Sequence, residues 1–132
     1  MKKAFTLFEL LVSISIIAIL VAVASTSYGT AQKKARDSRR IEDMNTIQKA
    51  AEMYYGQNSY VYPATTDAFV SSALIQLWPS DPKGVGYTAY SYSIGTTYCA
   101  CAAVENTNSG NATNNTCTFA NGGNFYCVKS QQ

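Results

Sequence analysis

The chain contains 132 residues, of which ten are basic, eight are acidic and none is histidine, so its formal net charge is +2. This near balance gives no support to nucleic acid as a partner. Without histidine the sequence lacks the commonest general base and metal ligand, and no other set of side chains forms a catalytic constellation. We therefore predict a protein that is not an enzyme and that has no cofactor and no metal site.

The N-terminal segment is apolar enough to cross a membrane. Every residue of the stretch 10–24 is apolar except Ser13 and Ser15, whose hydroxyls can bond back to the helix backbone. Together with the apolar residues between Phe5 and Phe8, the stretch reaches about twenty residues, which is enough to span roughly 30 Å of hydrocarbon. The segment can therefore anchor the chain in a bilayer.

The charges that flank this segment favour opposite orientations. Lys2 and Lys3 favour a cytoplasmic N-terminus. The sequence KKARDSRR at 33–40 carries more positive charge and would keep the other end of the segment in the cytoplasm. Charge alone therefore does not determine the orientation.

Glu9 interrupts the apolar run, and a carboxylate near the centre of a membrane-spanning helix costs roughly 2.5–3.5 kcal/mol on insertion scales. In one interpretation the segment is a secretory signal, cleaved after the A-x-A sequence 22–24 so that Ser25 becomes the first residue. Glu9, however, lies where the apolar core of such a signal should begin. In a second interpretation the segment is an unprocessed membrane anchor, in which Thr6 and Glu9 form a capping box at the helix start.

A third interpretation rests on the sequence FTLFELLVSISIIAIL, which follows a short basic leader and carries Glu9 at its fifth position. This N-terminus resembles the processing and assembly signal of type IV pilins and pseudopilins. The resemblance implies that a prepilin peptidase cuts between Ala4 and Phe5 on the cytoplasmic side and methylates the new amine of Phe5. Ala4 stands where the family strongly prefers glycine. We favour this interpretation over the secretory signal and the plain anchor.

The same resemblance gives Glu9 a partner. In the filament that the family implies, the Glu9 carboxylate of an incoming subunit would pair with the cationic Phe5 amine of its neighbour. A lone buried charge is costly and a matched pair much less so, and the pair would therefore favour one axial offset between subunits. Glu9 is thus the predicted assembly residue.

One helix is predicted from about Phe5 to Tyr55, so that it continues beyond the apolar segment. After Gly29, apolar residues recur at steps of three and four and form one stripe, which comprises Ile41, Met44, Ile47, Ala51, Tyr54 and Tyr55. The sequence Gly56, Gln57 and Asn58 is predicted to end the helix.

Acidic residues at Asp37, Glu42 and Asp43 are interspersed with the basic residues of 33–40, so that Lys33 with Asp37 and Arg39 with Asp43 are i,i+4 neighbours. This pattern favours a solvated or intersubunit ion-pair face of the helix over a nucleic-acid site.

The residues beyond the helix predict a small head. Asp67 can cap a short helix that runs through Leu77. Strands are predicted at 87–94, 98–104 and 125–128. The segment 105–124 consists almost entirely of Asn, Thr, Ser, Gly and Ala, and it is predicted to be a loop because it cannot bury enough apolar surface to fold on its own. This layout is similar to that of major pseudopilins and of many small pilins.

The predicted fold is therefore α+β, and the resemblance implies the type IV pilin fold, with one long N-terminal helix, a small antiparallel sheet and a loop held by disulfides. The predicted divisions are a leader at 1–4, a hydrophobic transmembrane and filament-core half of the helix at 5–28, an amphipathic half at 29–56 and a globular head at 57–132. Within the head, the linker and short helix occupy 57–84, and the sheet and cysteine loop occupy 85–132.

Four cysteines lie in the last third of the chain, at Cys99, Cys101, Cys117 and Cys127. An even number behind a segment that suggests export favours disulfides, and zinc is less favoured because paired C-x₂-C sequences are absent. Three pairings are possible. If the chain after Cys101 folds back as an antiparallel strand, the nested pairing of Cys101 with Cys117 and of Cys99 with Cys127 is the simplest. Calcium is not expected, because residues 106–132 contain no carboxylate side chain.

We predict a structural pilin subunit that polymerises into an extracellular type IV pilus, used for adhesion or motility. Before assembly it would be a single-pass membrane protein with a cytoplasmic N-terminus. The resemblance implies a prepilin peptidase, an assembly platform and ATPases as partners. Two alternatives stay open, namely a major pseudopilin of a secretion or DNA-uptake system, and a membrane-anchored or secreted extracellular binding domain that acts as a monomer. The disulfide-held loop favours the pilus.

Overall fold

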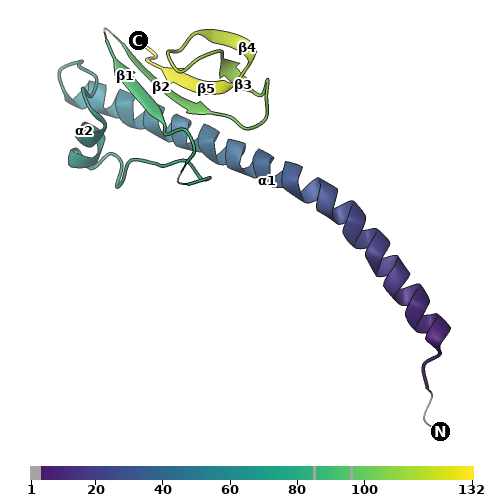
Figure 1. Cartoon of the computed structure of the whole chain (residues 1–132). Coiled ribbons are helices and arrows are strands. Elements are labelled where there is room, and N and C mark those ends of the chain that lie inside the picture. The colour runs from purple at the N-terminus through teal and green to yellow at the C-terminus, as the bar shows by residue number, and fades with distance from the viewer. Residues whose placement is uncertain (1–3, 85, 96) are drawn as a thin grey trace. The chain divides into compact units, whose positions relative to one another are not determined.

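The computed structural model describes residues 4–84, 86–95 and 97–132, without the side chain of residue 26. Its elements are helix α1 (Leu7–Gln57), helix α2 (Thr66–Ser71) and strands β1 (Ser91–Ile94), β2 (Tyr98–Ala103), β3 (Gly110–Ala112), β4 (Phe119–Gly123) and β5 (Phe125–Lys129) (Figure 1). The chain divides into two compact units, Met1–Lys33 and Lys34–Gln132, and α1 contributes residues to both.

The first unit presents an uncovered apolar helix surface. All side chains from residue 4 to residue 25 are exposed. The large apolar ones among them are Phe5, Leu7, Phe8, Leu10, Leu11, Val12, Ile14, Ile16, Ile17, Ile19, Leu20, Val21 and Val23. By length and composition α1 contains a stretch able to cross a membrane, with a mean hydropathy of 2.7 over 18 residues. A helix that is apolar all round needs a cover other than water.

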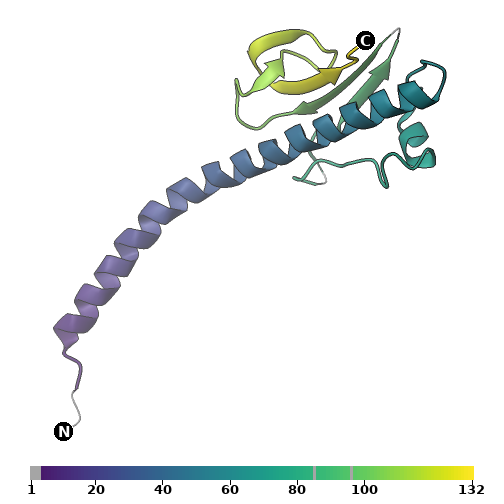
Figure 2. The same cartoon turned by 180° about the vertical axis from the view of Figure 1, so that it is seen from behind.

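The second unit packs one antiparallel sheet against the part of α1 that belongs to it. The five strands follow the order β1-β2-β5-β3-β4, and every neighbouring pair is antiparallel. Figure 2 shows this sheet and α2 alongside the C-terminal turns of α1. The arrangement confirms the expected α+β fold.

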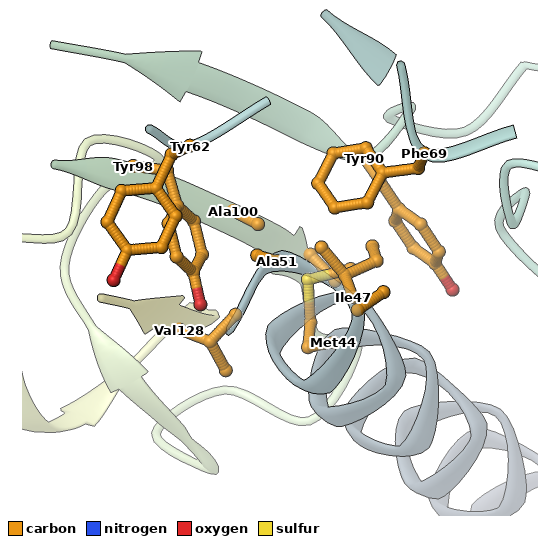
Figure 3. Close-up of a cluster of buried hydrophobic side chains, with 11 residues drawn as sticks. Met44, Ile47, Ala51, Tyr62, Phe69, Tyr90, Tyr98, Ala100 and Val128 are labelled. Carbon is orange, nitrogen blue, oxygen red and sulfur yellow. The ribbon is translucent and has the colours of Figure 1, made fainter. Parts of the chain in front are cut away.

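The core of the second unit lies between α1 and the sheet (Figure 3). Its most deeply buried side chains, each at most 4% exposed, are Met44, Ile47, Ala50 and Ala51 from α1, Phe69 from α2, and Tyr98, Ala100 and Ala102 from β2. The small alanine side chains on both surfaces let the helix backbone approach the sheet closely. Met44, Ile47 and Ala51 belong to the predicted apolar stripe, so the stripe is confirmed at these positions.

Strand β2 alternates between the two faces of the sheet. Its core residues occupy every second position, and Cys99 and Cys101 therefore lie on the opposite face. On that outer face Cys101 packs with Ala112 and Cys127 in a second, smaller cluster. The C-x-C spacing thus places both cysteines of β2 on one side, away from the core.

The long helix is confirmed, although it begins at Leu7 and not at Phe5. Helix α2 ends at Ser71, so the prediction that it runs through Leu77 was wrong. Its end is a Schellman arrangement, in which Ala73 has a φ of 55° and the N–H of Leu74 donates to the Phe69 carbonyl at 3.1 Å. Leu74 then packs against the core instead of extending the helix.

The predicted strands at 98–104 and 125–128 correspond to β2 and β5, whereas the strand predicted at 87–94 is shorter, because β1 begins only at Ser91. The segment 105–124 contains β3 and β4, so its prediction as a continuous loop was wrong. Two glycines make this pairing possible. A Cβ at Gly110 would collide with the carbonyl of Phe125, and a Cβ at Gly123 would collide with the carbonyl of Ala112. The polar composition of this segment did not indicate β3 and β4. These strands form because the backbones of β3 and β4 approach each other closely at the glycines and because β3 pairs with β5.

Candidate assembly site

Glu9 and Thr6 form a capping box at the start of α1. The backbone N–H of Thr6 donates to Oε2 of Glu9 at 2.9 Å, and the Thr6 hydroxyl donates to the same oxygen at 2.8 Å. In return, the backbone N–H of Glu9 donates to the Thr6 hydroxyl at 3.2 Å. The local interaction proposed for Glu9 is therefore present, and it holds the carboxylate against the first turn of the helix.

The Glu9 carboxylate keeps capacity for a further partner. Glu9 is the only charged residue in the sequence between positions 4 and 32. Both contacts from Thr6 fall on Oε2, and no residue in the described ranges donates a hydrogen bond to Oε1. An ionised carboxylate accepts several hydrogen bonds, and those from a cation are the strongest. The geometry can therefore accept a cationic donor from outside this unit.

The serine hydroxyls of the apolar segment are satisfied locally. Ser13 donates to the carbonyl of Glu9, Ser15 to that of Val12 and Ser25 to that of Val21, each at 2.8 Å. These bonds confirm that the hydroxyls turn back onto the helix backbone. Among the described side chains of this segment, the Glu9 carboxylate is thus the strongest polar group available for an intermolecular contact.

Ala4 and Phe5, the predicted cleavage and methylation positions, lie before the first residue of α1. Both are exposed, and the Phe5 side chain is 86% exposed. The peptide bond between them is therefore outside the helical hydrogen-bond ladder. This placement leaves it accessible to a peptidase.

The second unit contains a buried ion cluster that the sequence did not predict as such. Arg40, with no exposed surface, donates to Asp37 at 2.7 Å, to Glu105 at 3.0 Å and to both oxygens of Asp81 at 2.6 and 2.8 Å. Arg36 binds Glu105 through two hydrogen bonds of 2.6 and 2.8 Å. The expected ion-pair face is present, but its centre is buried and not solvated.

The cluster favours the ionised form of two of its carboxylates, Glu105 and Asp37. Hydrogen bonds from Arg36, and next those from Arg40, lower the pKa of Glu105 to about 2, against the opposing effect of burial. Burial alone would raise the pKa of Asp37, but the backbone N–H groups of Glu105 and Asn106 and the Arg40 guanidinium lower it overall. Arg40 belongs to α1, whereas its partners Asp81 and Glu105 lie in two loops of the head. The cluster therefore connects α1 to these two loops.

The four cysteines form two disulfides, Cys99–Cys117 and Cys101–Cys127, which confirms the predicted oxidation. The nested pairing was wrong. Cys101 lies directly opposite Cys127 in the β2–β5 register, whereas Cys99 lies opposite Lys129. Of the strands that follow β2 in the chain, the one that pairs with it is β5, and the segment between β2 and β5 forms β3 and β4. Cys117 approaches Cys99 from this segment.

Two features define the class of protein as pilin-like structural subunits. The helix begins with an uncovered apolar segment that carries one carboxylate, and the head packs a helix on a sheet with disulfides on the outer face of that sheet. Residues 1–25 match the family model described as the prokaryotic N-terminal methylation motif. Over 100 residues the chain is 37% identical to the type IV wide pilus major component PilA4 of Thermus thermophilus, covering 76% of this chain and 72% of that protein. The chain belongs to the type IV pilin family.

Proposed function

We propose that the mature chain polymerises into an extracellular type IV pilus filament, in which Glu9 of each subunit pairs with the Phe5 amine of a neighbour. The match to the methylation motif and the similarity to a major component of a wide pilus support polymerisation. The observation that carries the role of Glu9 is its position. It is the single charge of an exposed apolar segment, and its Oε1 receives no hydrogen bond from the described residues.

The energetics of the apolar segment support this arrangement. In the membrane, lipid covers the apolar side chains of 5–25, and in a filament the same segments of other subunits cover them. A carboxylate in such surroundings is costly unless it is paired. Cleavage before Phe5 creates one cationic amine on every copy, so each carboxylate has a matching charge. Pairing between neighbours then favours one axial offset, because any other offset leaves both charges unpaired.

Processing fits the placement of the first residues. Cleavage between Ala4 and Phe5 removes the leader 1–4, and the prepilin peptidase then methylates the Phe5 amine. This reaction requires a cytoplasmic N-terminus before assembly. The amphipathic half of the helix, 29–56, and the head, 57–132, lie outside the membrane, where the two disulfides are stable.

An assembly platform and its ATPases would supply the work of extraction from the membrane.

The second candidate function is a pseudopilus subunit of a secretion or DNA-uptake system, since the same N-terminal motif serves both kinds of filament. The disulfide-held segment favours a surface pilus. A monomeric extracellular binding domain would need neither the Glu9 charge nor a new amine at Phe5.

Substitutions at Glu9 test the proposal. Glu9→Gln retains the side-chain length and removes the charge, whereas Glu9→Val also removes the capping box. We expect both variants to insert and fold, and to form at least about tenfold fewer filaments by negative-stain electron microscopy, a factor that corresponds to a loss of about 1.4 kcal/mol. Ser15→Ala is the matched control, because this hydroxyl donates only to the helix backbone in the described structure. Wild-type filament yields from Glu9→Val would refute the role of Glu9.

The intact mass of the protein from cells tests the processing step separately. A chain that begins at Phe5 and carries one additional methyl group supports prepilin processing. A chain that begins at Ser25 has lost Glu9 and would instead support a secreted binding domain.

A further inference from the structure

We propose that Lys33 and Lys34 of α1 bind the phosphate groups of anionic phospholipids in the outer leaflet of the cell membrane, while the subunit is still anchored there. Binding would hold the helix at one depth in the bilayer before assembly. The proposal rests on the proposed export of the head from an anchored precursor. It does not depend on the pairing of Glu9 with the Phe5 amine, which belongs to the filament.

Both lysines keep free ammonium groups. Their side chains are exposed, and neither ammonium group forms an ion pair or a hydrogen bond with a described residue. The other basic residues of 33–40 differ in this respect, because Arg36, Arg39 and Arg40 each contact at least one carboxylate. Within the described chain, the lysine pair is thus the part of this basic sequence that an external anion can reach.

The acidic residue closest to the lysines in the sequence is engaged inside the head. Asp37 is the i,i+4 neighbour of Lys33 in the sequence, and it is only 5% exposed. One of its oxygens accepts hydrogen bonds from Arg40 at 2.7 Å and from the backbone N–H of Glu105 at 2.8 Å. The other accepts from the backbone N–H and the side-chain amide of Asn106, at 3.0 and 2.6 Å. Both oxygens are used within the head, so the lysines are left for an anion from outside the chain.

The spacing along the helix places the lysines just beyond the hydrocarbon. The apolar stretch ends at Ala24, and Lys33 lies nine positions later, about 13.5 Å further along the helix axis at 1.5 Å per residue. The headgroup region is about 5–7.5 Å thick on each side of the hydrocarbon. Side chains on a helix lean toward its N-terminus, which here is the membrane side. The long lysine side chains therefore extend back toward the phosphates.

Tyr28 supports this depth. It lies four positions after Ala24, about 6 Å along the axis and thus within the headgroup region. Its side chain is 67% exposed. Tyrosine is enriched at membrane–water interfaces, where the ring lies at the headgroup level. The order of apolar stretch, tyrosine and lysine pair therefore matches the order of hydrocarbon, interface and phosphate in one leaflet.

The chemistry of the lysine pair selects an anionic headgroup. A lysine ammonium is a compact charge with three donors, which suits phosphate oxygens. Basic residues next to a membrane segment are attracted to the negative surface potential of anionic lipids. A phosphatidylcholine headgroup carries its own cation, which offsets the phosphate charge, whereas phosphatidylglycerol has no such cation. The inferred ligand is therefore the phosphate of an anionic phospholipid.

The test uses the full-length chain in lipid nanodiscs that contain equal parts of phosphatidylglycerol and phosphatidylcholine. Native mass spectrometry of the released monomer counts the lipids of each kind that stay bound. We expect wild type to retain phosphatidylglycerol in excess, and the excess to fall as salt is raised, because exposed charges are screened. The measurement uses the monomer, so a failure of filament assembly leaves its result unchanged.

Variants that remove a charge identify the site. Lys33→Gln and Lys34→Gln should each lower the ratio of bound phosphatidylglycerol to phosphatidylcholine by about fivefold, a factor that corresponds to about 1 kcal/mol for one lysine near an anionic surface. Lys33→Arg should keep the preference, because it keeps the charge. Lys49→Gln is the matched control, because it removes the same charge from an exposed position further along α1, and it should keep the wild-type ratio.

Three outcomes would overturn the proposal. The first is a wild-type chain without a preference for phosphatidylglycerol. The second is an equal loss in Lys49→Gln, because net charge and not position would then set the preference. The third is a lower filament yield from Lys33→Gln and Lys34→Gln with an unchanged lipid ratio, which would assign the lysines to a carboxylate of a neighbouring subunit.

Discussion

Arg40 and Asp81 lie 41 positions apart in the sequence and form a two-bond ion pair inside the head. Nε of Arg40 donates to Oδ2 at 2.6 Å, and Nη2 donates to Oδ1 at 2.8 Å. The Arg40 side chain is 0% exposed and the Asp81 side chain is 4% exposed. A buried pair is sustained only when its remaining donors and acceptors are satisfied, and here Nη1 of Arg40 binds Asp37 and Glu105. The pair fixes the loop before β1 to α1.

Replacement of Arg40 by alanine should therefore destabilise the head strongly. The variant leaves three buried carboxylates without their central cation, and we expect the free energy of unfolding to fall by about 3–5 kcal/mol. Arg39→Ala is the matched control, because Arg39 is 64% exposed and its pair with Asp43 is expected to contribute at most about 1 kcal/mol. Denaturant unfolding monitored by the fluorescence of Trp78 measures both. Equal losses for the two variants would contradict the central role of Arg40.

Acid should destabilise the head through Glu105. Hydrogen bonds from Arg36 hold the pKa of this carboxyl at about 2, below its ordinary value of 4.5. A group whose pKa is lower in the folded state stabilises the fold fully above its ordinary pKa and loses that contribution as the pH falls toward the folded value. We expect the thermal midpoint to fall between about pH 4.5 and pH 2, by about 4–8 °C for each kcal/mol lost. Asp37, with its lowered pKa, acts in the same direction.

Glu105→Gln provides the comparison for this pH profile. The variant should be less stable than wild type at pH 7, and the difference should shrink as the pH approaches 2, because Glu105 is then protonated in the unfolded wild type and about half protonated in the folded wild type. Thermal scans of both proteins at a series of pH values measure the difference. A difference that stays constant over this range would show that Glu105 does not titrate with a lowered pKa.

Local patterns were sufficient to predict the long helix and its core-facing stripe. The spacing of Met44, Ile47 and Ala51 depends only on helix geometry, and the structure buries all three. The strands β3 and β4 depend instead on partners elsewhere in the chain. Apart from Phe119, their residues are small or polar and carry no strand signal. Their pairing depends on β5, where Phe125 lies opposite Ala112.

The assembly site and the ion cluster likewise differ in whether their contacts are local in the sequence. Glu9 was evident from sequence, because a single charge in an apolar run is conspicuous, and Thr6 three residues earlier indicated the capping box that the structure contains. Arg40 was not singled out, because its partners Asp81 and Glu105 are 41 and 65 positions away. Pairing rules for neighbours on a helix could identify only contacts such as that of Arg39 with Asp43.

Two glycines should respond oppositely to alanine. At Gly123 a Cβ would collide with the carbonyl of Ala112, and the strand pairing must shift to admit it, so we expect Gly123→Ala to lose about 1–3 kcal/mol of stability. At Gly56, near the end of α1, a Cβ meets no atom within 4 Å. Alanine there should be neutral or stabilising by up to about 1 kcal/mol, because glycine costs more conformational entropy in a helix. Denaturant unfolding compares the two, and a stabilised Gly123→Ala would contradict the pairing of β3 with β4.

Double cysteine variants test the disulfide pairing. Replacing Cys99 and Cys117 by serine removes one disulfide and leaves Cys101–Cys127 intact, and a closed loop of 18 residues accounts for about 3 kcal/mol in the chain-entropy description. Replacing Cys99 and Cys127 removes one half of each disulfide, so both contributions are lost and the remaining Cys101 and Cys117 are left without their partners. We expect the second variant to unfold at lower temperature and to show two reactive thiols after denaturation, against none for the first. The reverse order of stability would instead establish the nested pairing, because only that pairing leaves a native bond between Cys101 and Cys117.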